Sequence, residues 1–260
     1  MILLHGGPGV SGYLGPLGSA LGDRLQVIEP FQRGSGGEPL TVARHVEDLH
    51  ELVGRLGRRP ALVGHSWGAM LALAYAAAHP DGAACLALIG CGTFDSASRA
   101  RMHAVREDRT TSGLRRALAD LATRLPDPDA RLRAMGGLLL RIYSFDPIVE
   151  NLELAGCDAT AYEEAWADMI RLQEDGLYPA AFAAIRTPAI MLHGAHDPHP
   201  GRMTYETLVR HIPHLEYREW ERCGHYPWLE REIHQDFTRF LHGWLMTHLE
   251  MSASLTPPPA

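Results

Sequence analysis

The sequence predicts an α/β protein with a mostly parallel sheet of about six strands flanked by helices. Short apolar runs alternate along the chain with longer amphipathic stretches. Several of the short runs are apolar throughout, as expected of strands that are covered on both faces. The chain has 260 residues, of which 46% are hydrophobic and 21% charged. It is therefore long enough to bury the core of one such domain with an insertion.

The predicted strands and the longer helices alternate in chain order. The strands are predicted at residues 2–4, 26–29, 61–63, 85–89, 189–192 and 216–220. The helices are predicted at 41–56, 67–79, 201–211 and 228–249. Thr41 is a suitable N-cap for the first helix, and Gly57 follows its end.

Residues 94–185 interrupt this alternation, because they show helical patterns and no convincing strand. The patterns include 112–124, 129–143 and 159–174, with prolines between them. We interpret the stretch as a helical cap inserted before the strand at 189–192. The core then comprises 1–93 and 186–250, and the proline-rich tail 251–260 is expected to be disordered. An independent helical domain is the alternative for 94–185.

Charge and composition exclude some classes of partner. The formal net charge is −7, and no basic patch is present, which argues against nucleic acid. No apolar run reaches the roughly 18 to 20 residues of a membrane span, and the first residues do not resemble a secretory leader. The four cysteines lack CxxC spacing, which favours free thiols in a reducing compartment. We therefore expect a cytoplasmic protein without nucleic-acid or membrane partners.

The strongest motif is G-x-S-x-G, formed by Gly64, Ser66 and Gly68 between a predicted strand and a predicted helix. A nucleophile on such a turn has a strained backbone, and its neighbours two residues away must be small. The turn also leaves the Trp67 N–H free at the start of the helix, where it can donate to a developing oxyanion. The alternative is a structural serine that caps this helix.

On this motif and its context, the chain resembles the α/β-hydrolase superfamily over nearly its whole length. The resemblance implies a serine, acid and histidine in that chain order. Residues 224–230 resemble the superfamily's G-H-x-P-x-x-E segment, which implies that His225 is the general base. Residues 194–198 resemble its acid loop, which implies that Asp197 orients the histidine. A turn aspartate before proline is the alternative for Asp197.

Histidines beside Asp197 also suggest a zinc site, formed by His193, His196, Asp197 and His199. We favour the triad, because Asp197 already has a role there. The prediction is an enzyme with no metal and no cofactor.

The loop His5-Gly6-Gly7-Pro8-Gly9 follows the first predicted strand, and its glycines let the backbone approach a substrate. The family resemblance implies that the Gly7 N–H is the second oxyanion donor, beside that of Trp67. A phosphate-binding loop is the weaker alternative. This loop and residues 32–36 (QRGSG) resemble the proline iminopeptidase branch. Two departures from that branch are Phe31, in place of an aspartate, and His65, in place of the expected glycine.

The predicted function is a serine hydrolase that cleaves an acyl ester, thioester, lactone or amide through Ser66, His225 and Asp197. A proline iminopeptidase-like aminopeptidase is also compatible with the sequence, and it would need cap glutamates to hold the substrate amine. The available ones are Glu150, Glu153, Glu163, Glu164 and Glu174. A carbon–carbon bond hydrolase, a lyase, an acyltransferase and a non-enzymatic binding module are further hypotheses. If an N-terminal hairpin is missing, the strand at 26–29 is exposed and could support a homodimer.

Overall fold

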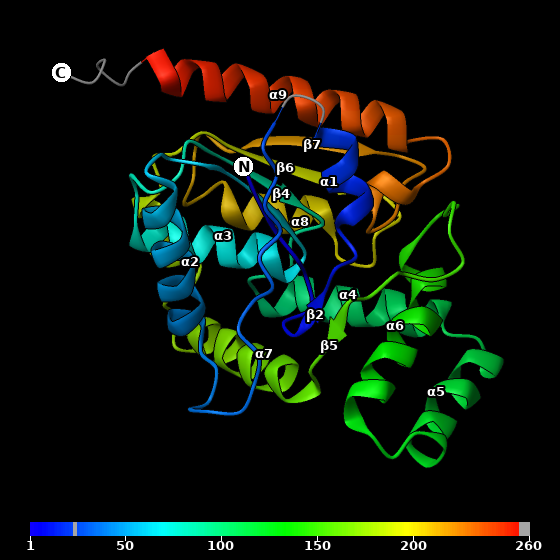
Figure 1. Cartoon of the computed structure of the whole chain (residues 1–260). Coiled ribbons are helices and arrows are strands. Elements are labelled where there is room, and N and C mark those ends of the chain that lie inside the picture. Colours follow the sequence, from blue (N-terminus) through cyan, green and yellow to red (C-terminus); the bar gives the residue numbers. More distant parts are fainter. Residues whose placement is uncertain (23–24, 255–260) are drawn as a thin grey trace.

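The computed structural model describes residues 1–22 and 25–254 (Figure 1). Its strands are β1 (Ile2–Leu4), β2 (Val10–Ser11), β3 (Ala61–His65), β4 (Cys85–Ile89), β5 (Gly156–Cys157), β6 (Ala189–Gly194) and β7 (Glu216–Trp220). Its helices are α1 (Gly15–Leu21), α2 (Val42–Leu56), α3 (Trp67–Ala78), α4 (Ser96–Arg109), α5 (Ser112–Arg124), α6 (Pro128–Tyr143), α7 (Ala159–Glu174), α8 (Gly201–Leu208) and α9 (His234–Ser254), with 3₁₀ turns η1 (Ala180–Ala184) and η2 (Pro227–Leu229).

A five-stranded, fully parallel sheet forms the centre, in the order β1-β3-β4-β6-β7. Its register places Leu4 beside Gly64, and His65 beside Ile89. The loops after β1, β3, β6 and β7 therefore leave from one edge of the sheet. The predicted catalytic and oxyanion residues lie on these loops or at the start of the helix that follows. The α/β class is thus confirmed.

The sixth predicted strand, 26–29, is reduced to a single parallel bridge between Ile28 and Ile2. Two backbone hydrogen bonds support it: Leu3 N donates to Ile28 O at 2.8 Å, and Ile28 N donates to Met1 O at 3.1 Å. Pro30 lacks an N–H and restricts the residue before it, so regular pairing stops there. The segment still lies on the far side of β1 from β3. The winding of the sheet therefore reverses between β1 and β3, where open α/β sheets bind ligands. Homodimer formation through this edge stays a prediction.

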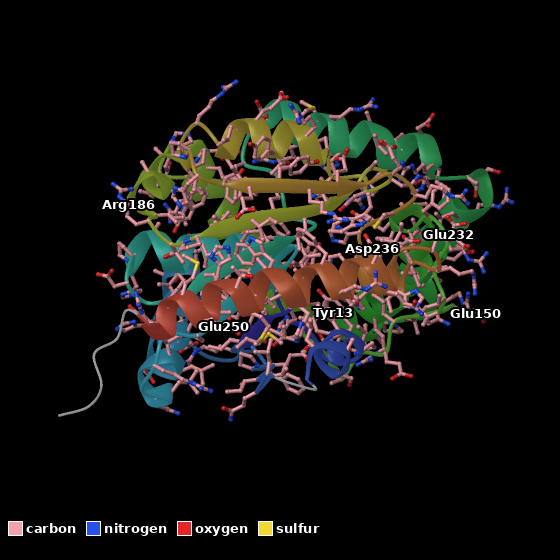
Figure 2. The ribbon with its side chains drawn as sticks, turned by 90° about the horizontal axis from the view of Figure 1, so that it is seen from above. Tyr13, Glu150, Arg186, Glu232, Asp236 and Glu250 are labelled. Atoms are coloured by element: carbon pink, nitrogen blue, oxygen red, sulfur yellow. The ribbon has the colours of Figure 1, made fainter. Side chains whose placement is uncertain are left out.

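Helices cover both faces of the sheet because successive strand residues point to opposite sides. On β4, Leu86 and Leu88 pack in the core formed with α2, α3 and α8, whereas Cys85, Ala87 and Ile89 pack in the core formed with α1 and α9. Figure 2 shows α9 lying along the second face. Helix α3 is buried along most of its length, which fits its almost wholly apolar sequence.

Several helix boundaries match their sequence signals. Helix α2 begins after Thr41, whose side chain accepts a hydrogen bond from Arg44 N, and ends before Gly57, whose φ is +61°. Helix α9 begins at His234 and not at 228, because Pro227 starts a separate 3₁₀ turn. It also extends through 251–254, which were expected to be part of the disordered tail. The rest of that expected tail, 255–260, lies outside the described residues.

Helices α4 to α7 all lie between β4 and β6 in the chain, and the division into core and helical cap stays a prediction. The patterns at 112–124 and 159–174 match α5 and α7, and α6 begins one residue before the predicted 129. Helix α4 was not predicted individually, since only Ser98 is buried along it and its apolar periodicity is weak. The β2–β5 pair and α1 were also not predicted. No helix within the described residues is long and apolar enough to span a bilayer.

Candidate active site

Ser66 occupies a strained turn between β3 and α3. Its φ of +55° and ψ of −117° are unusual, and within the described residues it is the single non-glycine residue with positive φ. The turn is held by Ser66 N, which donates to Ile89 O at 2.8 Å. A Cβ at Gly64 would collide with the backbone of Gly68, and one at Gly68 would collide with the backbone of Leu4. The G-x-S-x-G spacing is thus required sterically.

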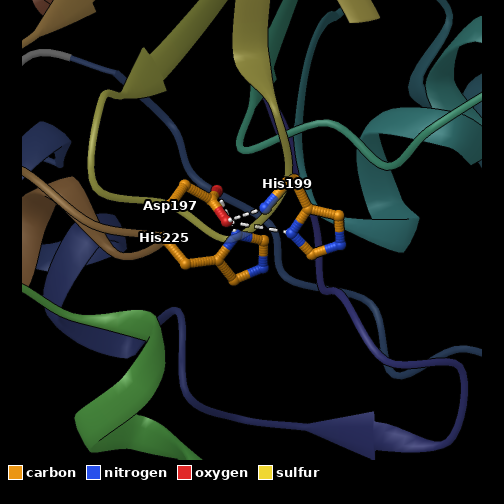
Figure 3. Close-up of side chains that lie close together, drawn as sticks. All are labelled: Asp197, His199 and His225. Carbon is orange, nitrogen blue, oxygen red and sulfur yellow. Dashed lines mark hydrogen bonds and ion pairs between the residues drawn. The ribbon is translucent and has the colours of Figure 1, made fainter. Parts of the chain in front are cut away.

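Asp197 and His225 form a buried pair, shown in Figure 3. The His225 Nδ1–H donates to Asp197 Oδ2 at 2.5 Å. Burial lowers the pKa of His225, and Asp197 offsets only part of that effect. The imidazole is therefore neutral near pH 7, with Nε2 free of hydrogen, as a general base requires.

Two further histidines contact the Asp197 carboxylate. His199 approaches Oδ1 with both its backbone N and its Nδ1, each at 2.9 Å. His193 Nε2 lies 3.3 Å from Oδ2. Burial alone would raise the pKa of Asp197, but His225, His199 and His193 outweigh it and hold that pKa well below the usual value. The carboxylate thus stays ionised and fixed in orientation.

Ser66 and His225 both line one cavity of about 700 Å³, together with His199 and Gly7. The Ser66 hydroxyl makes no hydrogen bond to another described residue, so it is available within that cavity. The structure thus brings Asp197 and His225 into direct contact, and it places Ser66 in the same cavity. Their action as a triad remains a proposal.

The two predicted oxyanion donors lie on the loop after β1 and at the first residue of α3, and Gln32 joins these two segments. Its side chain donates to His5 O at 2.9 Å and accepts from the Trp67 indole N–H, also at 2.9 Å. Its backbone N donates to His5 Nε2 at 3.2 Å. Burial lowers the pKa of His5 to about 4, so this ring accepts as a neutral imidazole. Gln32 thereby fixes the glycine loop of Gly7 relative to the start of α3.

His65, the residue before Ser66, joins the same loop to the His225 loop. Gly6 N donates to the Tyr13 hydroxyl at 2.6 Å, and that hydroxyl donates to His65 Nδ1 at 2.7 Å. His65 Nε2–H then donates to His225 O at 2.9 Å. Burial holds the pKa of His65 well below its usual value, which agrees with a neutral ring in these roles.

Glu230 fixes the His225 loop to the chain that follows α6. This buried carboxylate accepts from Gly224 N at 2.8 Å, Phe145 N at 2.8 Å and Asp146 N at 2.7 Å. In addition, His225 N donates to Tyr143 O at 2.7 Å. The end of α6 and the base are therefore held together by one side chain and one backbone bond.

Ligand atoms of Asp197, His199 and His225 lie within 4.8 Å of one another, close enough for a metal ion. The His225 and His199 Nδ1 atoms already contact the carboxylate, so a cation would have to replace the hydrogen bonds that orient the base. Of the four residues considered for a zinc site, His196 instead packs edge-on against Phe145. The absence of a metal stays a prediction.

Sequence reasoning missed three residues around the site: Tyr13, Gln32 and His199. Gln32 lay in a family-like segment but had no assigned role, and His199 was weighed only as a metal ligand. Tyr13 has no local signal, because its partner His65 is 52 residues away in the chain.

Comparison with known proteins agrees with this fold. Residues 1–235 match the alpha/beta hydrolase family, and the chain belongs to that family and is a hydrolase. It is 27% identical to a proline iminopeptidase of Lactobacillus helveticus over 277 aligned positions, which cover 96% of this chain and 90% of the relative.

Two solved structures are similar in fold. A monoacylglycerol lipase from Paleococcus ferrophilus has a TM-score of 0.61 at 20% identity, covering 95% of this chain and 93% of the other. A proline iminopeptidase from Mycobacterium smegmatis has a TM-score of 0.62 at 21% identity, covering 95% and 89%. The resemblance to the iminopeptidase branch is thus confirmed as a resemblance.

Proposed function

We propose that the chain is a serine hydrolase that cleaves an acyl ester, thioester, lactone or amide through an acyl-enzyme. The observation that carries the proposal is the Asp197–His225 hydrogen bond of 2.5 Å, in the same cavity as the strained Ser66. We also propose that the substrate is a small acyl compound and that the protein acts in the cytoplasm.

The proposed reaction begins when His225 Nε2 takes the Ser66 hydroxyl proton and Oγ attacks the acyl carbonyl. The oxyanion accepts hydrogen bonds from the N–H groups of Gly7 and Trp67. Neither amide has a hydrogen-bond partner among the described residues, so both can donate to substrate. His225 then gives its proton to the leaving group. Water, activated by the same base, hydrolyses the acyl-enzyme and restores Ser66.

A fluorophosphonate probe tests this function, because it labels an activated serine. We expect the probe to label Ser66 in the wild-type protein, p-nitrophenyl esters to be hydrolysed, and Ser66→Ala to remove both signals. Ser112→Ala, at an exposed serine that begins α5, is the control and should behave as wild type. Hydrolysis that persists in Ser66→Ala would refute the proposal.

An aminopeptidase is the second candidate, supported by the names of the relatives. Of the five glutamates that the sequence offered for amine binding, only Glu174 lines the cavity. Glu164 instead accepts a hydrogen bond from Leu40 N at 2.9 Å. We therefore favour an ester or amide substrate without a free amine at the site. Cleavage of proline naphthylamide faster than of short esters would reverse this preference.

A further inference from the structure

Arg106 on α4 lines the cavity without a partner for its charge. Its guanidinium makes no hydrogen bond or ion pair with another described residue. It lies instead over the ring of Tyr143, 5.7 Å from the centroid. The adjacent acid Glu107 does not neutralise it, because that side chain pairs with Arg115 at 2.7 Å. An unpaired, half-buried guanidinium inside a cavity is suited to a ligand carboxylate.

The other charged residues around this cavity are also mostly positive. Arg99 faces it and donates to the neutral Gln173 at 2.5 Å, whereas Arg171 is already paired with Asp168 and Asp175. Glu174 is the single carboxylate lining the cavity within the described residues. The chain as a whole carries a formal charge of −7, so these positive charges around the cavity are not a general property of its surface.

Other residues that line the cavity are apolar and suit a hydrocarbon chain. They include Leu132, Met135, Leu139, Leu152 and Leu154. Tyr143 lies between Arg106 and the proposed base. Its ring centroid is 5.2 Å from that of His225. A ligand carboxylate at Arg106 would therefore lie one aromatic ring away from the base.

We propose that the cavity selects an acyl substrate that carries a carboxylate, and that Arg106 binds this carboxylate. The inference rests on the proposed hydrolase function for the bond that is cleaved. It assigns Arg106 as a specificity-determining residue and carboxylate-bearing acyl compounds as the substrate class. Uncharged lipid esters and substrates with a free amine fall outside that class.

Two chromogenic esters that differ only in charge test the proposal. These are the mono-p-nitrophenyl ester of octanedioic acid and its methyl-capped, neutral form. We expect the acid to have a kcat/KM about tenfold higher, as one charge-assisted hydrogen bond provides. Arg106→Gln should abolish that preference while leaving the neutral ester within about twofold. Arg101→Gln, on an exposed part of the same helix, is the matched control and should keep the preference.

A substrate with its carboxylate on the leaving group tests which end of the substrate Arg106 binds. If 3-carboxy-4-nitrophenyl octanoate is the substrate that depends on Arg106, the anion belongs to the leaving group, and the site is still an anion site. Equal rates for charged and neutral substrates of both kinds would overturn the proposal. So would equal losses on charged and neutral esters in Arg106→Gln, because they would mean that Arg106 only supports Tyr143.

Calorimetry in the Ser66→Ala background separates this inference from the hydrolase function. Octanedioate should bind more tightly than octanoate, and Arg106→Gln should remove the difference. This result would support the anion site even if Ser66→Ala retained turnover. Equal binding of the two acids would overturn the site even if the esters were hydrolysed by Ser66.

Discussion

The imidazole of His199 stacks on that of His225, with ring centroids 4.7 Å apart and planes 20° from parallel. Both rings direct Nδ1 to the same Asp197 carboxylate, one to each oxygen (Figure 3). His225 is thus held by an acid and by a second ring, and His199 is a positioning residue for the proposed base.

His199→Ala tests this positioning. The variant removes one hydrogen bond to a charged carboxylate, which contributes roughly 1.5–3 kcal/mol, so kcat/KM should fall ten- to about a hundredfold. Because His199 lowers the pKa of His225, the acid limb of the pH profile should also move upward. His242→Ala, on α9, is the control. A stable variant with wild-type rates and an unchanged pH profile would contradict the role.

The pH dependence of kcat/KM should reflect the neutral form of His225. Burial lowers its pKa below 6.5, so activity should be present above that lowered pKa and disappear as the pH falls through it. The midpoint of the acid limb is therefore expected below 6.5. In Asp197→Asn the limb should move further down, since Asp197 raises the pKa of His225. Its kcat should fall about 10⁴-fold, as when the triad acid is lost elsewhere. A midpoint above 6.5 in the wild type would argue against His225 as the base.

Ser66→Gly should increase stability while removing activity. The positive φ of Ser66 costs a non-glycine residue about 1 kcal/mol, which glycine avoids. Chemical denaturation should therefore show a higher free energy of unfolding for Ser66→Gly than for Ser66→Ala, with neither variant hydrolysing ester. Equal stability of the two variants would show that the turn is not strained.

Glu230→Gln should weaken the link between the His225 loop and the end of α6. An amide at this position accepts fewer of the three backbone hydrogen bonds and adds an N–H group facing them. We expect a loss of about 2 kcal/mol in the free energy of unfolding, together with a lower kcat. Glu232→Gln is the matched control, because its exposed carboxylate only pairs with Arg222. Equal effects of the two substitutions would show that Glu230 has no special role.

The parts of the site that depend on local chain geometry could be predicted from the sequence. Gly64 is required because a Cβ there would collide with the backbone of Gly68 four residues later, so this part of the spacing is local and indicates the turn at Ser66. The need for Gly68 comes from the neighbouring strand, because a Cβ there would collide with the backbone of Leu4. In parallel sheets the loops after the strands gather at one edge, which also made Asp197 and His225 predictable from their positions after β6 and β7.

Other features depend on how distant segments pack. The segment 26–29 had the composition of a strand, but Pro30 limits its pairing to one bridge. Tyr13 meets His65 across 52 residues, and Glu230 meets Phe145 across 85. No pattern near either residue encodes those contacts, because hydrogen-bond partners across such separations are chosen by the folded positions of the loops. The sequence therefore determined which predicted strands the site residues follow, together with the strained serine turn. The tertiary structure alone decided which side chains orient the base and which charges face the cavity.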